Sequence, residues 1–381
     1  MKIKKKLVEF IKKETVLTVA ILLAVLSAVM IPPDGEYVGY IDFRTLSILF
    51  CLMTVMAGLQ KLGVFRNIAK MLLQHTQNTI QLVEVLVLLC FFFSMIITND
   101  VSLITFVPFT FIVLRLAGEE AVKKLAVPVI VLQTIAANLG SMLTPIGNPQ
   151  NLYLYGKAQM AAGTFILLML PYSLLSLLLL VICGTIVAKR SGIEVRGTDV
   201  SLPEDGKVEQ KKYLLPAYLL LFVFCLLTVA HIVSYPLTLG IVILMVLILD
   251  RETMGKVDYS LLLTFVGFFI FIGNMGRMPA FCDFLQKIIG GREVMTAVIA
   301  SQVISNVPAA LLLSGFTENI TALIIGTNLG GLGTLIASMA SLISYKQVAR
   351  QIPGEKKKYF GWFTIANIVF LVILVLENCL L

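Results

Sequence analysis

Long apolar runs, one after another, are the feature that most constrains this sequence. A helix needs about 20 apolar residues to cross the hydrocarbon core of a bilayer, and the first such run covers Thr15–Ile31. Hydrophobic residues make up 58% of the 381 residues and charged residues only 14%, whereas a soluble domain is about 45–50% apolar and about 25% charged. No folded surface can hide that much apolar area from water. The sequence therefore predicts an all-α polytopic membrane protein and excludes a water-soluble enzyme core.

Further apolar runs follow along the chain, and several are too short or too interrupted to be simple membrane-spanning helices. They cover Phe43–Gln60, Leu82–Thr98, Val101–Leu116, Leu125–Leu143, Thr164–Ala188, Tyr213–His231, Leu237–Leu249, Ser260–Met275, Val294–Ile304, Ala309–Phe316, Ile320–Tyr345 and Phe360–Leu376. No small-residue cleavage site follows the first run before Pro32 and Pro33. We therefore expect a retained helix rather than a cleaved signal peptide.

Lysine and arginine lie mostly beside the ends of apolar runs, so the net charge of +8 indicates membrane orientation and no nucleic-acid partner. If segments 82–116 and 294–316 each enter and leave on one side, the positive-inside rule predicts a cytoplasmic N-terminus in the cell inner (plasma) membrane. Treating both as ordinary spans keeps much of this bias, so charge does not decide re-entrance. The basic residues left on the outer side are Arg44, Lys157, Arg277, Lys287 and Arg292.

The two halves of the chain contain an internal repeat. Asn138–Tyr155 aligns without gaps with Asn328–Tyr345, and further upstream Ser94–Asp100 aligns with Ser301–Val307. The blocks keep their order in both halves, and in the orientation above the two copies run in opposite directions through the membrane. Inverted repeats with interrupted helices are the architecture of secondary transporters.

Each repeat is predicted to contain a re-entrant hairpin and a broken helix. Thr144–Asn151 carries two prolines and a glycine, which predicts a break in a helix over about 125–158. The second copy, about 320–345, has no proline at its centre, and Gly330, Gly331 and Gly333 supply some of the freedom to break. The second hairpin, about 294–316, has arms too short to span. The first, about 82–116, has longer arms, so an interfacial loop between two spans is the alternative there.

These features predict five consecutive parts of the chain. They are an N-terminal transmembrane helix in 1–35, a first inverted repeat in 36–190, a cytoplasmic linker in 191–212, a connecting transmembrane helix in 213–235 and a second inverted repeat in 236–381.

Few polar residues are predicted to lie deep in the membrane. Asp100 follows the first hairpin tip, and an embedded carboxylate is by default a candidate functional residue. Asn138 and Asn328 are expected mainly to hydrogen-bond between packed helices. The two histidines are far apart and the six cysteines are scattered, so no metal centre, disulfide framework or enzyme is expected.

The hairpin tips Thr98–Asp100 and Ser305–Val307, together with the break at Thr144–Asn151 and its second copy, resemble the ion transporter superfamily. That group includes divalent-anion/sodium symporters, citrate permeases, arsenite permeases and NhaD-type sodium/proton antiporters. The resemblance covers roughly residues 40–380 and is closest to anion permeases. It implies elevator-type alternating access, a homodimer in the lipid bilayer, and no cofactor apart from Na⁺ as a candidate ion.

By position, the resemblance implies two cation sites and one substrate site. The first cation site comprises Ser94, Thr98, Asn99 and Gly147, with Asp100 beside it, and the second comprises Ser301, Ser305, Asn306 and Ala337. The substrate faces Asn99, Asp100, Asn148, Asn306, Val307 and Ser338. The dicarboxylate symporters have Thr where this chain has Asp100 and Val307. This departure favours a proton-coupled site, or one in which Asp100 holds a cation that bridges to an anion.

We therefore expect a secondary active transporter of a small, carboxylate-like anion, coupled to Na⁺ or H⁺. An arsenite efflux permease is an alternative, because arsenite is neutral at pH 7 and needs no cationic site. An NhaD-type sodium/proton antiporter is another, although antiporters usually need several buried carboxylates. A channel would need pore-lining symmetry and a filter, and neither is visible.

Overall fold

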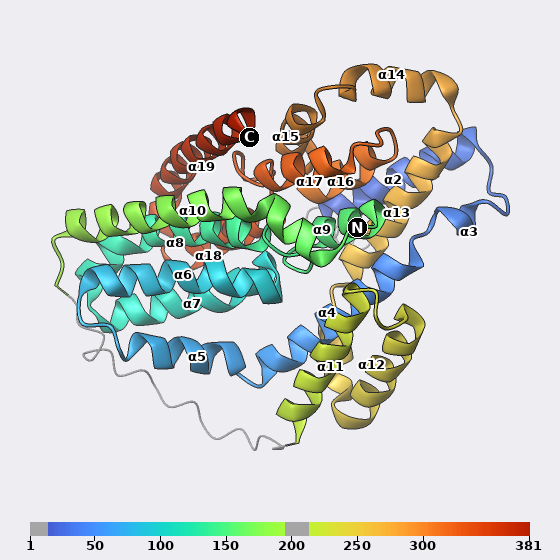
Figure 1. Cartoon of the computed structure of the whole chain (residues 1–381). Helices are drawn as coiled ribbons and strands as arrows, with labels where there is room; N and C mark the ends of the chain where they lie inside the picture. The colour runs from blue at the N-terminus through green and yellow to red at the C-terminus, as the bar shows by residue number, and fades with distance from the viewer. Residues whose placement is uncertain (1–13, 195–212) are drawn as a thin grey trace, which may run out of the picture.

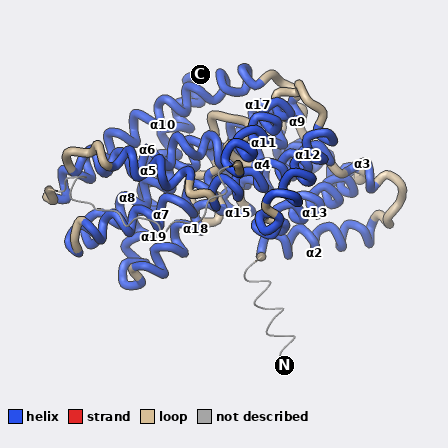
Figure 2. Tube along the Cα trace, turned by 90° about the horizontal axis from the view of Figure 1, so that it is seen from below, coloured by secondary structure: helices blue, strands red, loops and turns tan. Residues whose placement is uncertain are grey.

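The computed structural model describes residues 14–194 and 213–381. The basic N-terminal segment and most of the predicted linker 191–212 lie outside these ranges. The described residues form helices and loops and contain no strand (Figure 2). Seven of the described helices are long and apolar enough to cross a membrane. The prediction of an all-α polytopic membrane protein is confirmed.

The helices divide at residues 195–212 into a first and a second group. The first contains α2 (Thr15–Met30), α3 (Tyr37–Tyr40), α4 (Phe43–Lys61), α5 (Val64–Leu73), α6 (Thr79–Ile97), α7 (Asn99–Leu116), α8 (Glu119–Ser141), α9 (Pro149–Ala158) and α10 (Ala162–Ser191). The second contains α11 (Leu214–Val229), α12 (Tyr235–Leu249), the 3₁₀ helix η2 (Arg251–Lys256), α13 (Tyr259–Gly276), α14 (Pro279–Ile289), α15 (Glu293–Ile304), α16 (Asn306–Ser314), α17 (Ile320–Leu329), α18 (Met339–Gln351), the 3₁₀ helix η3 (Pro353–Glu355) and α19 (Lys356–Leu380).

The core of the molecule is built around α8. Helices α6, α7 and α10 lie alongside it at the left of Figure 1, and α18 and α19 also pack on it. After Lys124 the helix carries no charged residue, and every residue from Leu125 to Ser141 is buried. A helix that is uncharged and mostly apolar on every side must be surrounded by other helices, which explains its central position.

The remaining long helices form a separate packing cluster, in which helices of one half of the chain pack on helices of the other half. Helix α2 packs on α13, while α11 and α12 pack on α4 (Figure 1). At two contacts between the halves, Tyr218 of α11 on α4 and Tyr40 of α3 on α13, a tyrosine ring lies against a glycine. A Cβ atom at Gly58 of α4 would lie 2.2 Å from the ring of Tyr218, and one at Gly273 of α13 would lie 2.2 Å from the ring of Tyr40. These glycines are therefore required by the close packing of the helices.

An ion pair lies near each of these contacts between the two halves of the chain. Lys61 at the end of α4 lies 2.7 Å from Asp250 at the end of α12, and Arg277 after α13 lies 2.6 Å from Asp34 after α2. Asp250 also accepts hydrogen bonds from Tyr218 and Thr253. The hydrogen bond from Arg277 holds the pKa of Asp34 below its usual range. This second pair therefore persists at neutral pH and is lost as the pH falls through the lowered pKa.

We expect Lys61→Met to destabilise the protein by about 1–2 kcal/mol. The Asp250 side chain is only 8% exposed, so it would keep a poorly solvated charge without its cationic partner. Thermal unfolding of the detergent-solubilised protein measures the effect. Arg277→Gln is the control, because its ion pair is exposed on both sides and its loss should matter less. Equal losses in the two variants would contradict this expectation.

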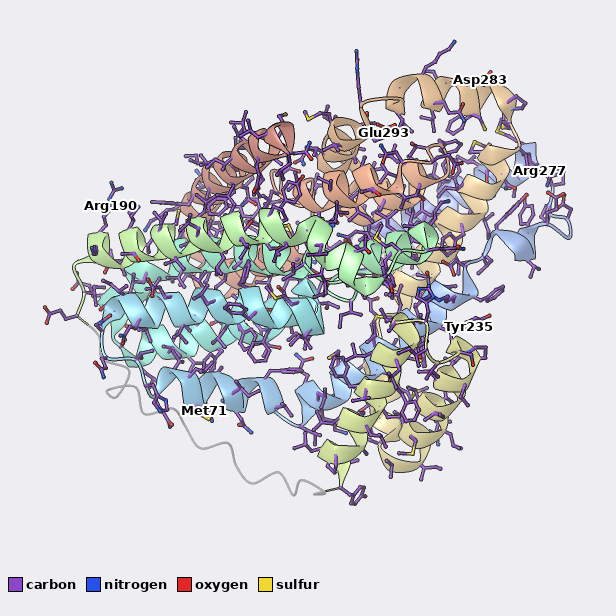
Figure 3. The ribbon with its side chains drawn as sticks, in the orientation of Figure 1. Met71, Arg190, Tyr235, Arg277, Asp283 and Glu293 are labelled. Atoms are coloured by element: carbon purple, nitrogen blue, oxygen red, sulfur yellow. The ribbon has the colours of Figure 1, made fainter. Side chains whose placement is uncertain are left out.

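Two short helices lie at opposite edges of the molecule, α5 along the bottom and α14 along the top of Figure 1. Figure 3 labels Met71 of α5 at the lower edge of the molecule and Asp283 of α14 at the upper edge. Helix α5 buries Phe65 and exposes Met71. Such an amphipathic helix suits a membrane–water interface.

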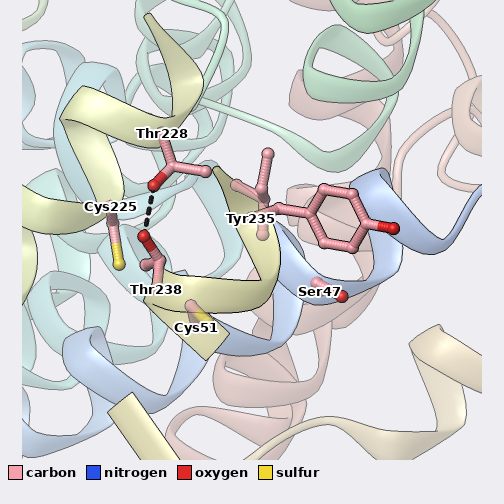
Figure 4. A pocket seen from close by; sticks show the side chains of 7 residues that line it. Ser47, Cys51, Cys225, Thr228, Tyr235 and Thr238 are labelled. Carbon is pink, nitrogen blue, oxygen red and sulfur yellow. Dashed lines mark hydrogen bonds between the residues drawn. The ribbon is translucent and has the colours of Figure 1, made fainter. Parts of the chain in front are cut away.

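A narrow gap separates α4 from α11 and α12 (Figure 4). The hydroxyl groups of Thr228 on α11 and Thr238 on α12 are hydrogen-bonded to each other on one side of it, and the thiols of Cys51 and Cys225 line it. It has no room for a water molecule. The gap therefore reflects helix packing and is not a ligand site.

Candidate functional site

The turns between α6 and α7 and between α15 and α16 have the same unusual backbone. Thr98 has φ 73° and ψ 152°, and Ser305 has φ 74° and ψ 154°. Backbone in this region costs a residue other than glycine about 1–3 kcal/mol, and such strained residues cluster at functional sites. The same costly conformation at the aligned position of both halves therefore marks the two tips as candidates.

Each tip contacts a break in a helix of its own half. The backbone N–H of Asn99 donates to the carbonyl oxygen of Gly147 at 3.2 Å, in the break between α8 and α9. The backbone N–H of Asn306 donates to the carbonyl oxygen of Ala337 at 2.9 Å, in the break between α17 and α18. The tips and the breaks therefore form two matching sets of polar backbone.

Local sequence explains the first break. Pro149 stands in the first turn of α9, where its missing N–H costs nothing. The side chain of Asn148 caps that helix by accepting the backbone N–H of Asn151 at 3.0 Å. A Cβ atom at Gly147 would lie 2.0 Å from the carbonyl oxygen of Ser141, so the tight turn requires glycine.

The second break has no proline and depends on a side chain from the neighbouring hairpin. The amide of Gln302 donates to the carbonyl oxygens of Gly330 and Leu332 and accepts the backbone N–H of Thr334. It therefore replaces the hydrogen bonds that an intact helix would have supplied. Gly333, with φ 102°, makes the turn possible. Sequence reasoning did not identify Gln302. The sequence signal that could have identified it is an amide side chain inside an apolar hairpin arm.

A network of neutral side chains joins the two halves at the breaks. The Oδ1 atom of Asn138 accepts from Nδ2 of Asn99 at 3.1 Å and from Oγ of Ser338 at 2.9 Å. These three residues are at most 5% exposed. Because Ser338 belongs to the second half, Asn138 connects the first hairpin tip to the second break.

A second chain of amides runs through the first break. Nδ2 of Asn148 donates to Oδ1 of Asn328 at 3.2 Å, and Nδ2 of Asn328 donates to Oδ1 of Asn151 at 2.6 Å. Asn138 and Asn328 do hydrogen-bond between helices, as the sequence predicts, and they connect the predicted site residues in doing so. We call Asn99, Asn138, Asn148, Asn151, Asn328 and Ser338 the asparagine centre.

Asp100 lies in the first turn of α7, beside the asparagine centre. Its backbone N–H donates to Oδ1 of Asn99 at 2.9 Å. Its own Oδ1 is buried and has no hydrogen-bond partner among the described residues. The N-terminal end of α7 favours a negative charge there, but an unpaired buried carboxylate oxygen is costly. The carboxylate is therefore positioned to take a cation, a proton or a water molecule.

The structure places the other predicted residues around this centre without joining all of them to it. Ser94 and Ser301 donate to carbonyls of their own helices and face Gly140 and Gly330, respectively. Val307 is buried beside the second tip. Among the described residues, no group of three His, Cys, Asp or Glu side chains is placed to hold a metal ion.

Similar sequences point to transport. A profile of the citrate transporter family matches residues 7–320. An uncharacterized transporter of Methanocaldococcus jannaschii is 32% identical over 313 residues, 82% of each chain. Inner membrane protein YbiR of Escherichia coli (strain K12) is 31% identical over 352 residues, 88% of this chain and 89% of that protein. A silicon efflux transporter of Oryza sativa subsp. japonica is 34% identical over 154 residues, 40% of this chain and 30% of that protein.

Proposed function

The chain belongs to the citrate transporter family, as the sequence motifs suggest, and on that basis we propose that it moves a small carboxylate-like anion as a secondary transporter coupled to Na⁺ or H⁺. Family and relatives make it a multi-pass membrane transporter and not an enzyme. Nothing in its family calls for an organic cofactor. The substrate, the coupling ion and the motion are our proposals.

The observation that carries the proposal is the meeting of eight helix ends. At each tip one helix ends and the next begins, from α6 to α7 and from α15 to α16. The same holds at each break, from α8 to α9 and from α17 to α18. The tip-to-break hydrogen bonds and the asparagine centre connect these ends. N-terminal helix ends favour anions, and C-terminal ends favour cations. One place can therefore bind an anion together with a cation, without a charged lysine or arginine.

We assign the cations to the helix C-terminal ends. One would bind among Ser94, Thr98, Asn99 and Gly147, and a second among Ser301, Ser305, Asn306 and Ala337. The Gly147 carbonyl accepts one tip N–H and keeps a second lone pair for a cation. The Ala337 carbonyl accepts the N–H of Asn306 and, at 3.4 Å, the hydroxyl of Ser305, which a cation would displace. The anion would face Asn99, Asp100, Asn148, Asn306, Val307 and Ser338.

Asp100 supplies the coupling charge in this proposal. A bare carboxylate there repels an anionic substrate, so a bound Na⁺ or proton is needed before the substrate binds. Transport would then move the hairpins and broken helices past the α2, α4, α11, α12 and α13 group. The cytoplasmic N-terminus, the re-entrant hairpins and the homodimer remain predictions.

Uptake into proteoliposomes tests the function. The full chain is reconstituted, and labelled citrate, succinate and malate are supplied with an inward Na⁺ gradient, an inward H⁺ gradient or no gradient. We expect saturable accumulation of at least one carboxylate, driven by one of the two gradients and absent from empty liposomes. Failure of all three to accumulate under both gradients would contradict the proposal.

A neutral hydroxylated solute is the second candidate. Amide and hydroxyl groups make up the asparagine centre, and such groups hydrogen-bond an uncharged oxyacid without any cation. The partial relative named as a silicon efflux transporter supports this alternative, which includes arsenite. Flux of silicic acid or arsenite without uptake of any carboxylate would favour it over the anion.

A further inference from the structure

A cavity of about 320 Å³ lies where α3, the start of α4, the end of α9 and α13 meet. It is separate from the asparagine centre. Arg44 of α4 and Lys157 of α9 line it, together with the buried aromatic rings of Tyr153 and Phe269. Both basic residues belong to the small set that the positive-inside rule leaves on the outer side.

Neither cation of the cavity has a carboxylate within ion-pair distance among the described residues, although Glu318 and Asp42 are near enough to Lys157 to interact with its charge. Within the described residues, neither Arg44 nor Lys157 forms an ion pair, whereas Lys61 and Arg277 both do. Asp42 is the acidic residue of the lining. Its carboxylate caps α4 by accepting the backbone N–H and the hydroxyl of Thr45 at 2.9 and 2.5 Å. Two cations and one carboxylate therefore line the cavity, an excess of one positive charge in the lining itself.

Arg44 is held in place by its surroundings. Its Nη2 atom lies 3.3 Å from Nε2 and 3.4 Å from Nδ1 of His231. Burial, and then the charge of Arg44, lower the pKa of His231, so the histidine stays neutral at neutral pH. A Cβ atom at Gly156 would lie 2.7 Å from Nη1 of Arg44. The missing side chain therefore lets the guanidinium lie directly on α9.

Helix α9 connects the cavity to the asparagine centre. Lys157 is six residues beyond Asn151 on this helix, a separation of about 9 Å along the axis. Tyr153 lies between them, and its hydroxyl is hydrogen-bonded to that of Ser314 at 2.9 Å. An anion in the cavity would therefore be less than two helical turns from the centre.

We propose that this cavity is an oxyanion-binding vestibule, in which Arg44 and Lys157 take the carboxylate of the transported anion at the outer mouth. The proposal rests on the proposed function, since it gives that function an entry site. Guanidinium and ammonium groups are the usual partners of carboxylates. The asparagine centre has neither, so the vestibule supplies the full positive charges that the centre lacks.

Thiol chemistry tests the vestibule without any transport assay. Lys157→Cys is reconstituted and treated with an anionic sulfonatoethyl or a cationic trimethylammonioethyl methanethiosulfonate, with the parent chain as the blank for the native cysteines. We expect the anionic reagent to be favoured, and Arg44→Gln in the same background to lower the anionic-to-cationic rate ratio about tenfold. A ratio that Arg44→Gln does not change would overturn the proposal, whatever the chain transports.

Protection of the thiol introduced by Lys157→Cys identifies the source of the oxyanion. Citrate is added to liposomes of phosphatidylcholine alone and to liposomes that also contain phosphatidylglycerol. Protection by citrate in both supports a soluble anion. Protection by phosphatidylglycerol alone would assign the cavity to a lipid headgroup and overturn its role as an entry site.

Uptake measurements complete the test once a carboxylate substrate is found. Arg44→Gln and Lys157→Gln should each raise KM about tenfold with little change in kcat, because they weaken capture and leave the asparagine centre intact. Lys287→Gln is the matched control, since Lys287 is an exposed residue of α14 outside the cavity lining. An equal effect of all three variants would show a general surface-charge effect and contradict the proposal.

Discussion

Replacing Asp100 with Asn is expected to reduce ion-driven uptake to the rate of empty liposomes while the protein stays folded. The side chains have nearly the same shape, so packing around α7 is preserved. The change removes the carboxylate whose buried Oδ1 atom has no partner among the described residues, and with it the group proposed to hold the coupling ion. Labelled-carboxylate uptake under the effective gradient measures the loss, and thermal unfolding verifies the fold.

Asp283→Asn is the matched control for this experiment. Asp283 is an exposed residue of α14 (Figure 3), and its replacement removes the same charge without touching the asparagine centre. We expect its uptake to equal that of the parent chain. If Asp100→Asn transported at the parent rate and still responded to the ion gradient, Asp100 would have no coupling role.

The second large effect is expected from adding one methyl group to α8. A Cβ atom at Gly140 would lie 2.0 Å from the carbonyl oxygen of Phe91 and 2.6 Å from Oγ of Ser94. Phe91 contributes backbone, which cannot rotate away, so Gly140→Ala must push α8 and α6 apart. Overpacking of this kind costs typically about 1–3 kcal/mol and occasionally more. We expect a loss of about 3 kcal/mol here, at the upper end of that range, and a large drop in the unfolding temperature.

Gly184→Ala provides the comparison. Gly184 is also a buried helical glycine, but a Cβ atom there would meet Glu84 and Val83 at an ordinary 3.8 Å. Alanine favours a helix over glycine by about 1 kcal/mol, so this variant should be as stable as the parent chain or more stable. Both variants are compared by thermal unfolding in the same detergent. Similar stabilities for the two would contradict the packing described for α6 and α8.

The parts of the fold that the sequence predicted follow from strong local constraints. A bilayer sets a minimum length for an apolar helix, so most of the long helices were expected where they lie. The first break was expected as well, because Pro145, Gly147 and Pro149 leave an intact helix no favourable course. The second helix also breaks, and α18 continues to Gln351 rather than ending at Tyr345.

The arrangement of the site depended on contacts that the sequence does not encode locally. Asn138 and Ser338 are 200 residues apart and meet only in the folded chain. The hydrogen bonds of Gln302 to the second break likewise depend on how α15 packs beside α17. An amide in an apolar helix shows that a partner exists but not which one. The asparagine centre therefore follows from the structure, although the sequence alone singles out every member except Asn151.

The exchanged packing of α2 and α13 has a consequence for how the protein is made. Helix α2 is synthesised early, yet its main partner is produced only after α12. During insertion, α2 therefore lacks its main packing partner while most of the chain is translated. In the same way, α4 is made before α11 and α12. The order in which the helices are made thus differs from the order in which they pack together. Packing of α2 on α13 is consequently a late step, and a chain interrupted before α13 leaves α2 without its main partner.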